Sequence, residues 1–447
     1  MGETSFSKNS FFTLLTEIII FIFGFIYLIV VARILGPEGK GIYSLILLIP
    51  GLMMVFGSFG IESANVYFIG SKKYKIQEVV ANSIILSVVL GVFLVVVFWG
   101  ISQTSFFQQF LRDNKIPPLY LWVIILTVPL YFISSFLRNV LRGYGNIEEY
   151  NKVRIVEGLV LFAAGIIFLL LLKQGLWGAV LSSVLSVFAA AFLSIFLVQK
   201  LVKIFPLSFN KNLLKDLLSY GSQVYLANNL SFLNYRLDMF LITIFLSPAA
   251  VGFYSVAVGI AEKLLVIPGA LATVLFPKVS SFVGDEANGL TSKILRHTAF
   301  IMIIVCLVMT FLAPFMVELF FGVSFLPSVL PILILLPGIL AFSMGGVLAA
   351  DLSGRGKPQF AVMSSSVGLF VNVILNIFFI PQWGITGAAL ASSIAYWLDT
   401  FVVLNAFLKI SKSPLKEVLI LKRDDFQDYI NLCIGFIASK KRRSIYK

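Results

Sequence analysis

Two stretches of the sequence share one pattern: Leu35–Ser44, which reads LGPEGKGIYS, and Leu246–Ser255, which reads LSPAAVGFYS. They lie 211 residues apart. Two further pairs match in the same order, at separations of 211 and 209 residues: Leu141–Gly145 with Leu352–Gly356, and Gly175–Ala179 with Gly384–Ala388. Because chance recurrence of Gly and Pro explains one match but not a shared register, the sequence indicates an internal duplication.

The composition is that of a membrane protein. Hydrophobic residues make up 59% of the 447 residues and charged residues 12%, whereas an ordinary globular domain carries about a quarter charged residues. Apolar runs of about 20 residues recur from end to end, which is typical of a polytopic helical membrane protein. The two cysteines cannot form a disulfide framework, and a single histidine excludes a histidine-based catalytic or zinc site. We therefore expect a protein that is not an enzyme and needs no cofactor or metal.

We predict an all-α fold with about 12 transmembrane helices in two six-helix bundles. The spans of the first half are Phe11–Ile34, Ile42–Ile69, Val79–Ile101, Pro118–Leu141, Arg154–Leu172 and Leu176–Val198. Those of the second half are Tyr220–Leu246, Gly252–Phe276, Ile294–Phe315, Val329–Leu352, Phe360–Ile380 and Ile385–Leu408. Since six spans return the chain to its starting side, the halves form a parallel repeat related by an axis along the membrane normal.

This duplication predicts the domain organisation. An N-terminal bundle covers residues 1–199, and a cytoplasmic linker covers 200–219. A C-terminal bundle covers 220–411, and residues 412–447 form an amphipathic basic tail. The apolar run of that tail is interrupted and too short to span a bilayer, so we expect it to lie at the membrane surface.

The basic residues predict the orientation. With the N-terminus placed in the cytoplasm, 27 of the 34 Lys and Arg residues fall in cytoplasmic segments and five in outer loops. Positive residues concentrate on the cytoplasmic side of membrane proteins, so we expect both termini there. The net charge of +13 then faces anionic lipid headgroups, and no nucleic-acid partner is required to explain it.

Charged residues inside the spans are the candidate site. Insertion of a central Arg, Lys or Asp costs about 2.5 to 3.5 kcal/mol, and such residues usually line a bundle interior or a watery cavity. Arg236 lies deep in the predicted seventh span, on one stripe with Asn229, and Lys263 lies in the eighth. We predict that these three residues line a cavity that attracts an anionic headgroup. The alternative is structural, with Arg236 paired to Glu62 and Lys263 paired to Asp238.

Acidic residues in the spans are candidates for a second role. Glu17 and Glu62 lie in the first two spans, and Asp238 lies in the seventh. We propose them as sites where a coupling cation binds, with the alternative that they only neutralise Arg236. No nucleotide-binding loop is present, so transport would use an ion gradient or the disequilibrium of the substrate itself.

The duplicated turn also carries a family resemblance. The stretches Ala32–Tyr43, Leu141–Gly145, Gly384–Ala389 and Lys422–Asp425 resemble those of polysaccharide biosynthesis proteins of the oligosaccharide flippase type. These belong to the multidrug/oligosaccharidyl-lipid/polysaccharide exporter superfamily. The resemblance extends over nearly the whole chain, but its motifs are structural turns and do not identify the cargo.

The resemblance implies a V-shaped, alternating-access transporter similar to the multidrug exporters of that superfamily. The implied cargo is a polyprenyl-pyrophosphate-linked oligosaccharide, flipped from the inner to the outer leaflet of a prokaryotic cytoplasmic membrane for O-antigen, exopolysaccharide or other surface polysaccharides. Membrane lipid, a polysaccharide polymerase and glycosyltransferases are the implied partners. Three alternatives stay open: a cation-coupled multidrug exporter, a lipid II flippase, and a scaffold that recruits glycan enzymes.

Overall fold

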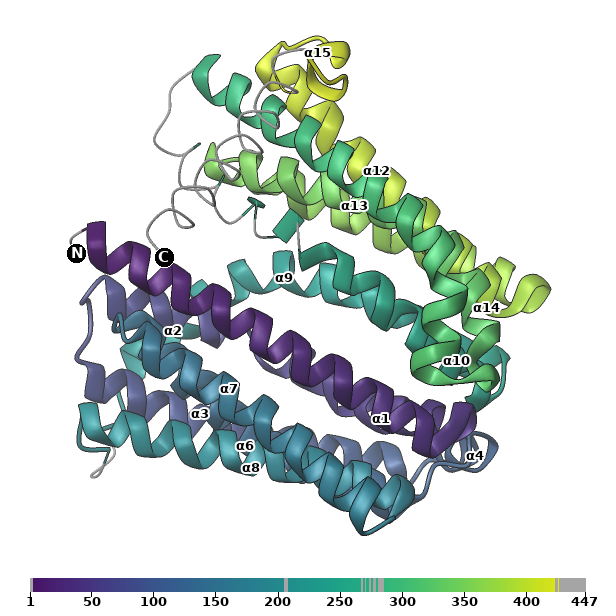
Figure 1. Cartoon of the computed structure of the whole chain (residues 1–447). Helices are drawn as coiled ribbons and strands as arrows, with labels where there is room; N and C mark the ends of the chain where they lie inside the picture. Colours follow the sequence, from purple (N-terminus) through teal and green to yellow (C-terminus); the bar gives the residue numbers. More distant parts are fainter. Residues whose placement is uncertain are drawn as a thin grey trace, which may run out of the picture. The chain divides into compact units, whose positions relative to one another are not determined.

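The computed structural model describes residues 3–204, 208–266 and 285–422, with positions 268, 269, 271, 272, 275, 279 and 425. Side chains are described within these ranges except for residues 3–11, 14, 223–236 and 285. All regular secondary structure in this part of the chain is helical (Figure 1). The first half comprises α1 (Glu3–Gly57), α2 (Ile61–Gly70), α3 (Ile76–Ser102), α4 (Ser105–Asp113), α5 (Pro118–Ile125), α6 (Val128–Gly143), α7 (Ile147–Gly165), the π-helical η1 (Ile166–Leu171) and α8 (Gly175–Leu201).

The second half continues with equally long helices. It comprises α9 (Lys211–Phe245), α10 (Pro248–Ala261), the 3₁₀ segment η2 (Glu262–Leu265), α12 (Asp285–Phe321), η3 (Val323–Ser328), α13 (Val329–Gly354), α14 (Gln359–Ser411) and α15 (Leu415–Leu419). In the described ranges, nine stretches are long and apolar enough to cross a membrane. This confirms the predicted all-helical, multi-pass fold.

The two longest helices each continue from one predicted span into the next. The predicted second span, Ile42–Ile69, is interrupted at Ser58–Gly60 and ends in α2 rather than in α1. α1 is broken at Gly36, which has a φ of +64°, and α14 is broken at Gly384, which has a φ of +60°. Glycine adopts such angles readily, and Pro37 then fits the first turn of the next helix because its missing N–H has no partner there anyway. The polar helix α9 is not among the nine apolar stretches and carries the predicted seventh span.

Prolines within the predicted spans differ in their effect on the helix. Pro129 lies at the start of α6, just after the turn that separates α6 from α5, so the predicted fourth span consists of two helices. Pro50 and Pro337, in contrast, lie inside α1 and α13 without a break at either residue. Membrane helices tolerate such prolines because neighbouring groups satisfy the backbone they disturb.

The backbone confirms the duplication at two matched pairs of glycines. Gly145 and Gly356 both have positive φ angles, +90° and +73°, at the ends of α6 and α13. The residue after each glycine donates its N–H to a carbonyl five residues earlier, from Asn146 to Leu141 at 3.0 Å and from Lys357 to Leu352 at 2.9 Å. This is the same glycine-dependent helix end in both halves. Gly175 and Gly384 also match, with φ angles of +58° and +60°.

The chain forms two compact units. The first contains Met1–Val256 and Met316–Ser328, and the second contains Ala257–Phe315 and Val329–Lys447. In the first unit, α7 packs along α1, α8 packs against α7, and α6 packs against both α3 and α8 (Figure 1). Their core includes fully buried aromatic side chains of α6, Phe132 and Phe136. This grouping follows spatial contact, and the predicted domains 1–199, 200–219, 220–411 and 412–447 stay a prediction.

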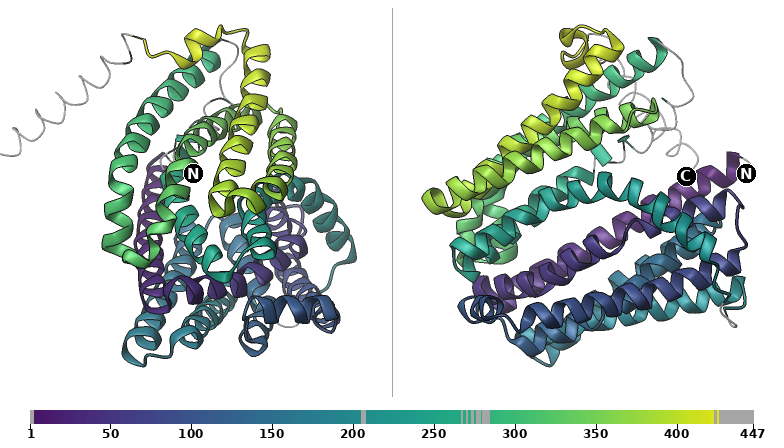
Figure 2. Two further views of the ribbon diagram at one scale, coloured as in Figure 1. Left: turned by 90° about the vertical axis from the view of Figure 1, so that its right-hand side faces the viewer. Right: turned by 180° about the vertical axis from the view of Figure 1, so that it is seen from behind.

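The core of the second unit joins α12, α13 and α14, which Figure 2 shows from two further sides. Leu295, Leu348 and Phe407 meet there and are fully buried. Val418 of α15 joins the same core, so the start of the predicted tail packs against the helices. The predicted amphipathic segment of the tail lies outside the described residues.

The predicted linker is partly helical and continues into α9. Leu213 and Leu217 are fully buried in the core of the first unit. On the exposed side, Lys73 and the Tyr74 hydroxyl both donate to Asp216 at 2.6 Å. The second part of the predicted linker is therefore the first part of α9, the helix that carries the predicted seventh span, and it packs against the first unit.

Candidate functional site

The structure places the predicted headgroup residues on separate segments. Asn229 and Arg236 lie in the middle of α9, but their side chains are outside the described ones. Lys263 lies in η2 and is half-buried. The cavity predicted for these three residues, and its alternative of ion pairs with Glu62 and Asp238, therefore stay predictions.

Asp238, a predicted coupling residue, is buried with hydrogen-bond donors around it. Its side chain is on α9 and 1% exposed. The hydroxyl of Tyr254, a fully buried side chain of α10, donates to Oδ2, and the N–H of Met239 donates to Oδ1 at 2.7 Å. A buried carboxylate needs such donors because burial of an unpaired charge is expensive. This contact joins the seventh span to the eighth.

The duplication contains a counterpart of this contact in the first half. Moving Asp238 and Tyr254 back by 211 residues gives Tyr27 and Tyr43. Their hydroxyl oxygens lie 2.9 Å apart and join the first span to the second. The Tyr43 hydroxyl also lies 2.7 Å from Oγ of Ser183 on α8. The two halves therefore repeat one interhelical contact, with a neutral pair in the first half and a carboxylate in the second.

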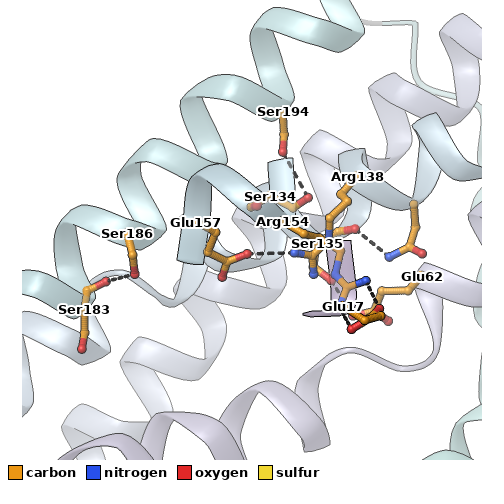
Figure 3. A network of polar contacts seen from close by, with 11 residues as sticks. Glu17, Glu62, Ser134, Ser135, Arg138, Arg154, Glu157, Ser183, Ser186 and Ser194 are labelled. Atoms are coloured by element: carbon orange, nitrogen blue, oxygen red, sulfur yellow. Dashed lines mark hydrogen bonds and ion pairs between the residues drawn. The ribbon is translucent and has the colours of Figure 1, made fainter. Parts of the chain in front are cut away.

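Glu17, the next predicted coupling residue, forms an ion pair. Both of its carboxylate oxygens accept from the guanidinium of Arg154 on α7, one of them from Nη2 at 3.1 Å (Figure 3). The Glu17 side chain is 48% exposed and that of Arg154 is 23% exposed. Bidentate contacts between arginine and a carboxylate are among the stronger hydrogen bonds in proteins, so this pair ties α1 to α7.

Glu62, on α2, accepts a hydrogen bond from the Ser135 hydroxyl at 3.2 Å. Three residues further along α6, Arg138 donates through Nη1 to Glu157 of α7 at 2.9 Å (Figure 3). Nε of Arg138 is buried and has no acceptor in the described part of the chain. Arg138 and Glu157 are only 17% and 29% exposed, so they pair within the protein although both lie near the ends of predicted spans.

These five charged residues form one polar cluster across α1, α2, α6 and α7 (Figure 3). It contains three carboxylates and two guanidinium groups, so with every group ionised the cluster has a charge of −1. Such a cluster suits a cation or proton better than an anion.

A cavity of about 390 Å³ lies among the helices of the first unit. Most of its wall is apolar, and its polar wall includes the side chains of Tyr27, Lys40, Tyr43, Tyr131, Glu157 and Ser183. It therefore touches both the repeated tyrosine pair and the charged cluster. Lys40 is 7% exposed and donates to Oγ of Ser44 at 2.8 Å.

Sequence reasoning missed several of these residues. Tyr27, Tyr43 and Tyr254 are uncharged and looked like ordinary apolar positions, although the 211-residue register applied to Asp238 would have found them. Arg154 and Glu157 were placed at a helix end, because one sequence does not show which faces of α1 and α7 meet. In the described ranges, no three His, Cys, Asp or Glu residues lie close enough to hold a metal ion.

The fold defines the class of protein. A solved multidrug transporter of the MATE family, captured in its inward-facing conformation, matches with a TM-score of 0.71 over 87% of this chain and 94% of that chain, at 18% identity. The solved lipid II flippase MurJ matches with a TM-score of 0.72 over 98% of this chain and 99% of that chain, at 16% identity. The chain is thus a multi-pass membrane protein with the fold of the multidrug and lipid exporters, as predicted.

The sequence then identifies the family. The family described as "Polysaccharide biosynthesis protein" matches residues 6–283, which is more than half of the chain. This protein belongs to that family, and the resemblance read from the duplicated turn is confirmed.

Curated relatives extend over most of the chain. An uncharacterised membrane protein of Methanocaldococcus jannaschii is 24% identical over 412 residues, covering 85% of this chain and 80% of its own length. A protein named as an O-antigen transporter in Shigella flexneri is 21% identical over 388 residues, covering 83% of this chain and 90% of its own length. A protein named as a low-salt glycan biosynthesis flippase in Haloferax volcanii is 23% identical over 389 residues, covering 85% of this chain and 79% of its own length.

Proposed function

We propose that this protein flips a polyprenyl-pyrophosphate-linked oligosaccharide from the inner to the outer leaflet of a prokaryotic cytoplasmic membrane. The family match over residues 6–283 carries the proposal. The relatives named as O-antigen transporter and glycan flippase support it, since each matches about four fifths or more of its own length. The multi-pass fold provides the several packed helices that such a carrier needs.

The chemistry of this cargo explains why a protein is needed. A pyrophosphate is a strongly hydrated anion and resists entry into hydrocarbon, whereas the polyprenyl tail can stay in lipid. Arg236 and Lys263, with Asn229, would meet the headgroup in a cavity that stays open to the lipid. With the cell interior negative, outward movement of an anion is favoured by about 2.3 kcal/mol per charge per 100 mV.

Coupling to a cation gradient would add to this driving force. Of the three candidates, Glu17 is already bonded to Arg154, and Glu62 lies beside an arginine that is bonded to Glu157. Asp238 accepts from a tyrosine hydroxyl and a backbone N–H, and its counterpart in the first half is the neutral Tyr27. This comparison favours Asp238 as the carboxylate that gains and loses a proton or monovalent cation.

The orientation follows from the distribution of Lys and Arg. Both termini would lie in the cytoplasm, where the basic tail meets anionic lipid. The end of the first unit that carries the duplicated turns would then face the outside. A polysaccharide polymerase would use the flipped product there, and glycosyltransferases would supply the cargo on the inner side.

Deletion of the gene in its own cells tests this function. We expect loss of a surface polysaccharide and accumulation of its lipid-linked oligosaccharide in the inner leaflet, both reversed by the wild-type gene. Sensitivity to cationic drugs should not change. Normal surface glycans together with increased drug sensitivity would instead identify a multidrug exporter, and accumulation of lipid II would identify a lipid II flippase.

A further inference from the structure

The two copies of the duplicated turn pack against each other in the first unit. A Cβ atom added to Gly41 would lie 1.7 Å from the carbonyl oxygen of Pro248. A Cβ atom added to Gly252 would lie 1.9 Å from the carbonyl oxygen of Pro37. Gly41 and Gly252 are equivalent positions of the repeat, as are Pro37 and Pro248. The contact is therefore reciprocal, like the contact across the two-fold axis of a dimer.

Only glycine permits this approach. Ordinary contact of a Cβ atom begins at 3.4 Å, so alanine at position 41 would require the two turns to separate by about 1.7 Å. Small residues allow membrane helices to approach until backbone meets backbone, where the contacts are weak and individually reversible.

Further contacts hold the first half to the second at the same end of the unit. Arg33, just before the first turn, donates through Nε to the carbonyl oxygen of Phe320 at 2.7 Å and through Nη2 to that of Leu319. These carbonyls belong to the last turn of α12, where unpaired acceptors and the helix dipole favour a cation. The Phe25 ring meets that of Phe320 edge to face at 5.8 Å.

A second glycine contact joins the halves elsewhere along α9. A Cβ atom on Gly60 would lie 2.2 Å from the carbonyl oxygen of Gly221, and one on Gly221 would lie 2.3 Å from that of Phe59. In the 211-residue repeat, the position equivalent to Gly60 is Leu271 and the position equivalent to Gly221 is Ser10. This contact therefore has no glycine counterpart in the other half. Of these two glycine contacts, only the one between the duplicated turns joins equivalent positions of the two halves.

We propose that the Gly41–Gly252 contact is the outer gate of the transporter, closed by the glycines and latched by Arg33. The proposal rests on the proposed function and orientation. A hydrated oligosaccharide cannot cross a contact in which two backbones touch, so the turns must part each time the cargo leaves. Because each turn lies at the start of a helix, small rotations of α1 and α10 would open both sides of the contact together.

The first test bridges the gate covalently. In a variant with Cys306 and Cys433 replaced by Ala, Phe25→Cys and Phe320→Cys are joined by a short bis-methanethiosulfonate, which forms a disulfide with each cysteine and releases methanesulfinate. We expect at least a tenfold loss of glycolipid flipping, with recovery after reduction. The matched control joins Glu38→Cys to Lys115→Cys, an ion-paired couple at 2.6 Å within the first half, and should keep its activity. Equal flipping before and after reduction in the gate pair would overturn the proposal.

The second test does not depend on transport. Spin labels on Glu38→Cys and Leu326→Cys report the distance across this end of the unit. Gly41→Ala and Gly252→Ala should each shift the population towards a longer distance. Gly24→Ala, on the same helix but with nothing within 4 Å of its added Cβ, should not. An unchanged distance in both gate variants would refute the gate. A shifted distance in a protein that moves no glycolipid would leave the gate standing and refute the proposed function.

Discussion

Replacement of Asp425 by Asn should destabilise the second unit, because it breaks a buried ion pair between α12 and the segment after α15. Arg296 of α12 donates through Nε to one carboxylate oxygen at 2.6 Å and through Nη2 to the other at 2.9 Å. Nη1 donates to the carbonyl oxygen of Glu417 at 2.6 Å. The two charged side chains are only 6% and 3% exposed. One guanidinium thus holds this segment at two points.

The pKa of Asp425 indicates how much stability the ion pair contributes. The hydrogen bonds from Arg296 lower it from 3.8 to about 2. One pKa unit corresponds to about 1.4 kcal/mol, so the ionised folded state gains about 2 kcal/mol. Removal of one partner also leaves the other buried and unpaired, and such losses are about 3 to 5 kcal/mol. We expect Asp425→Asn to lower the free energy of unfolding by about 2 to 4 kcal/mol, or the Tm by roughly 5 to 15 °C.

The assay is thermal unfolding of the purified protein in detergent at pH 7. Glu417→Gln is the matched control, because this side chain is 57% exposed and lies 3.8 Å from its partner Lys422. Exposed pairs contribute about 0 to 1 kcal/mol, so its Tm should hardly change. Arg296→Met combined with Asp425→Asn should recover part of the loss in a double-mutant cycle.

The pH dependence has a definite sign. The pKa of Asp425 is lower in the folded protein than in the unfolded chain, so its stabilisation is complete above the unfolded value near 4 and is lost as the pH falls towards 2. The difference in stability between wild type and Asp425→Asn should therefore be constant from pH 8 to 5 and shrink below 4. His297, 3.9 Å from the carboxylate, is replaced by Gln in both proteins. Equal Tm values for wild type and Asp425→Asn at pH 7 would refute this reasoning.

Three further predictions concern transport and topology. Arg236→Ala should abolish flipping in a folded protein if Arg236 binds the pyrophosphate. Arg236→Lys should recover only part of the activity, because Lys lacks the two-pronged donor geometry of Arg. If Glu62→Gln restores the export and the Tm of Arg236→Ala, the two residues instead form a structural ion pair. Glu17→Gln and Glu62→Gln should reduce flipping and its response to a proton or sodium gradient if either residue couples transport, and an unchanged gradient dependence in both would exclude them. Reporters fused after Lys447 and inserted at Ser208 should both report the cytoplasm, and an outer signal from either would show that the topology is wrong.

The sequence was sufficient to predict the fold, because the length of each apolar segment and the glycines at the turns can be recognised without knowing which helices are neighbours. Gly145 and Gly356 mark equivalent helix ends in both halves, and their pattern is visible without knowledge of any neighbour. The sequence did not show that the predicted second and fourth spans each consist of two helices, because the effect of a proline or glycine depends on the groups packed around it.

The candidate site was less predictable, because it depends on how the helices are rotated about their axes. The cost of burying a charge identified Glu17, Glu62 and Asp238 but not their partners. The partners Arg154 and Tyr254 come from other helices, and only the packed structure shows that they face these carboxylates. The reciprocal contact of the duplicated turns likewise requires both turns to be seen together.

The most direct measurement is the rate of flipping in liposomes that contain the purified protein and a fluorescent polyprenyl-pyrophosphate-linked oligosaccharide. An added reagent quenches only the outer leaflet, so the movement of label between leaflets is followed in real time. We expect the wild-type protein to move the glycolipid at least tenfold faster than liposomes without protein, and Arg236→Ala to remove that difference. A wild-type rate equal to that of protein-free liposomes, with rapid movement of a cationic dye, would contradict a flippase function.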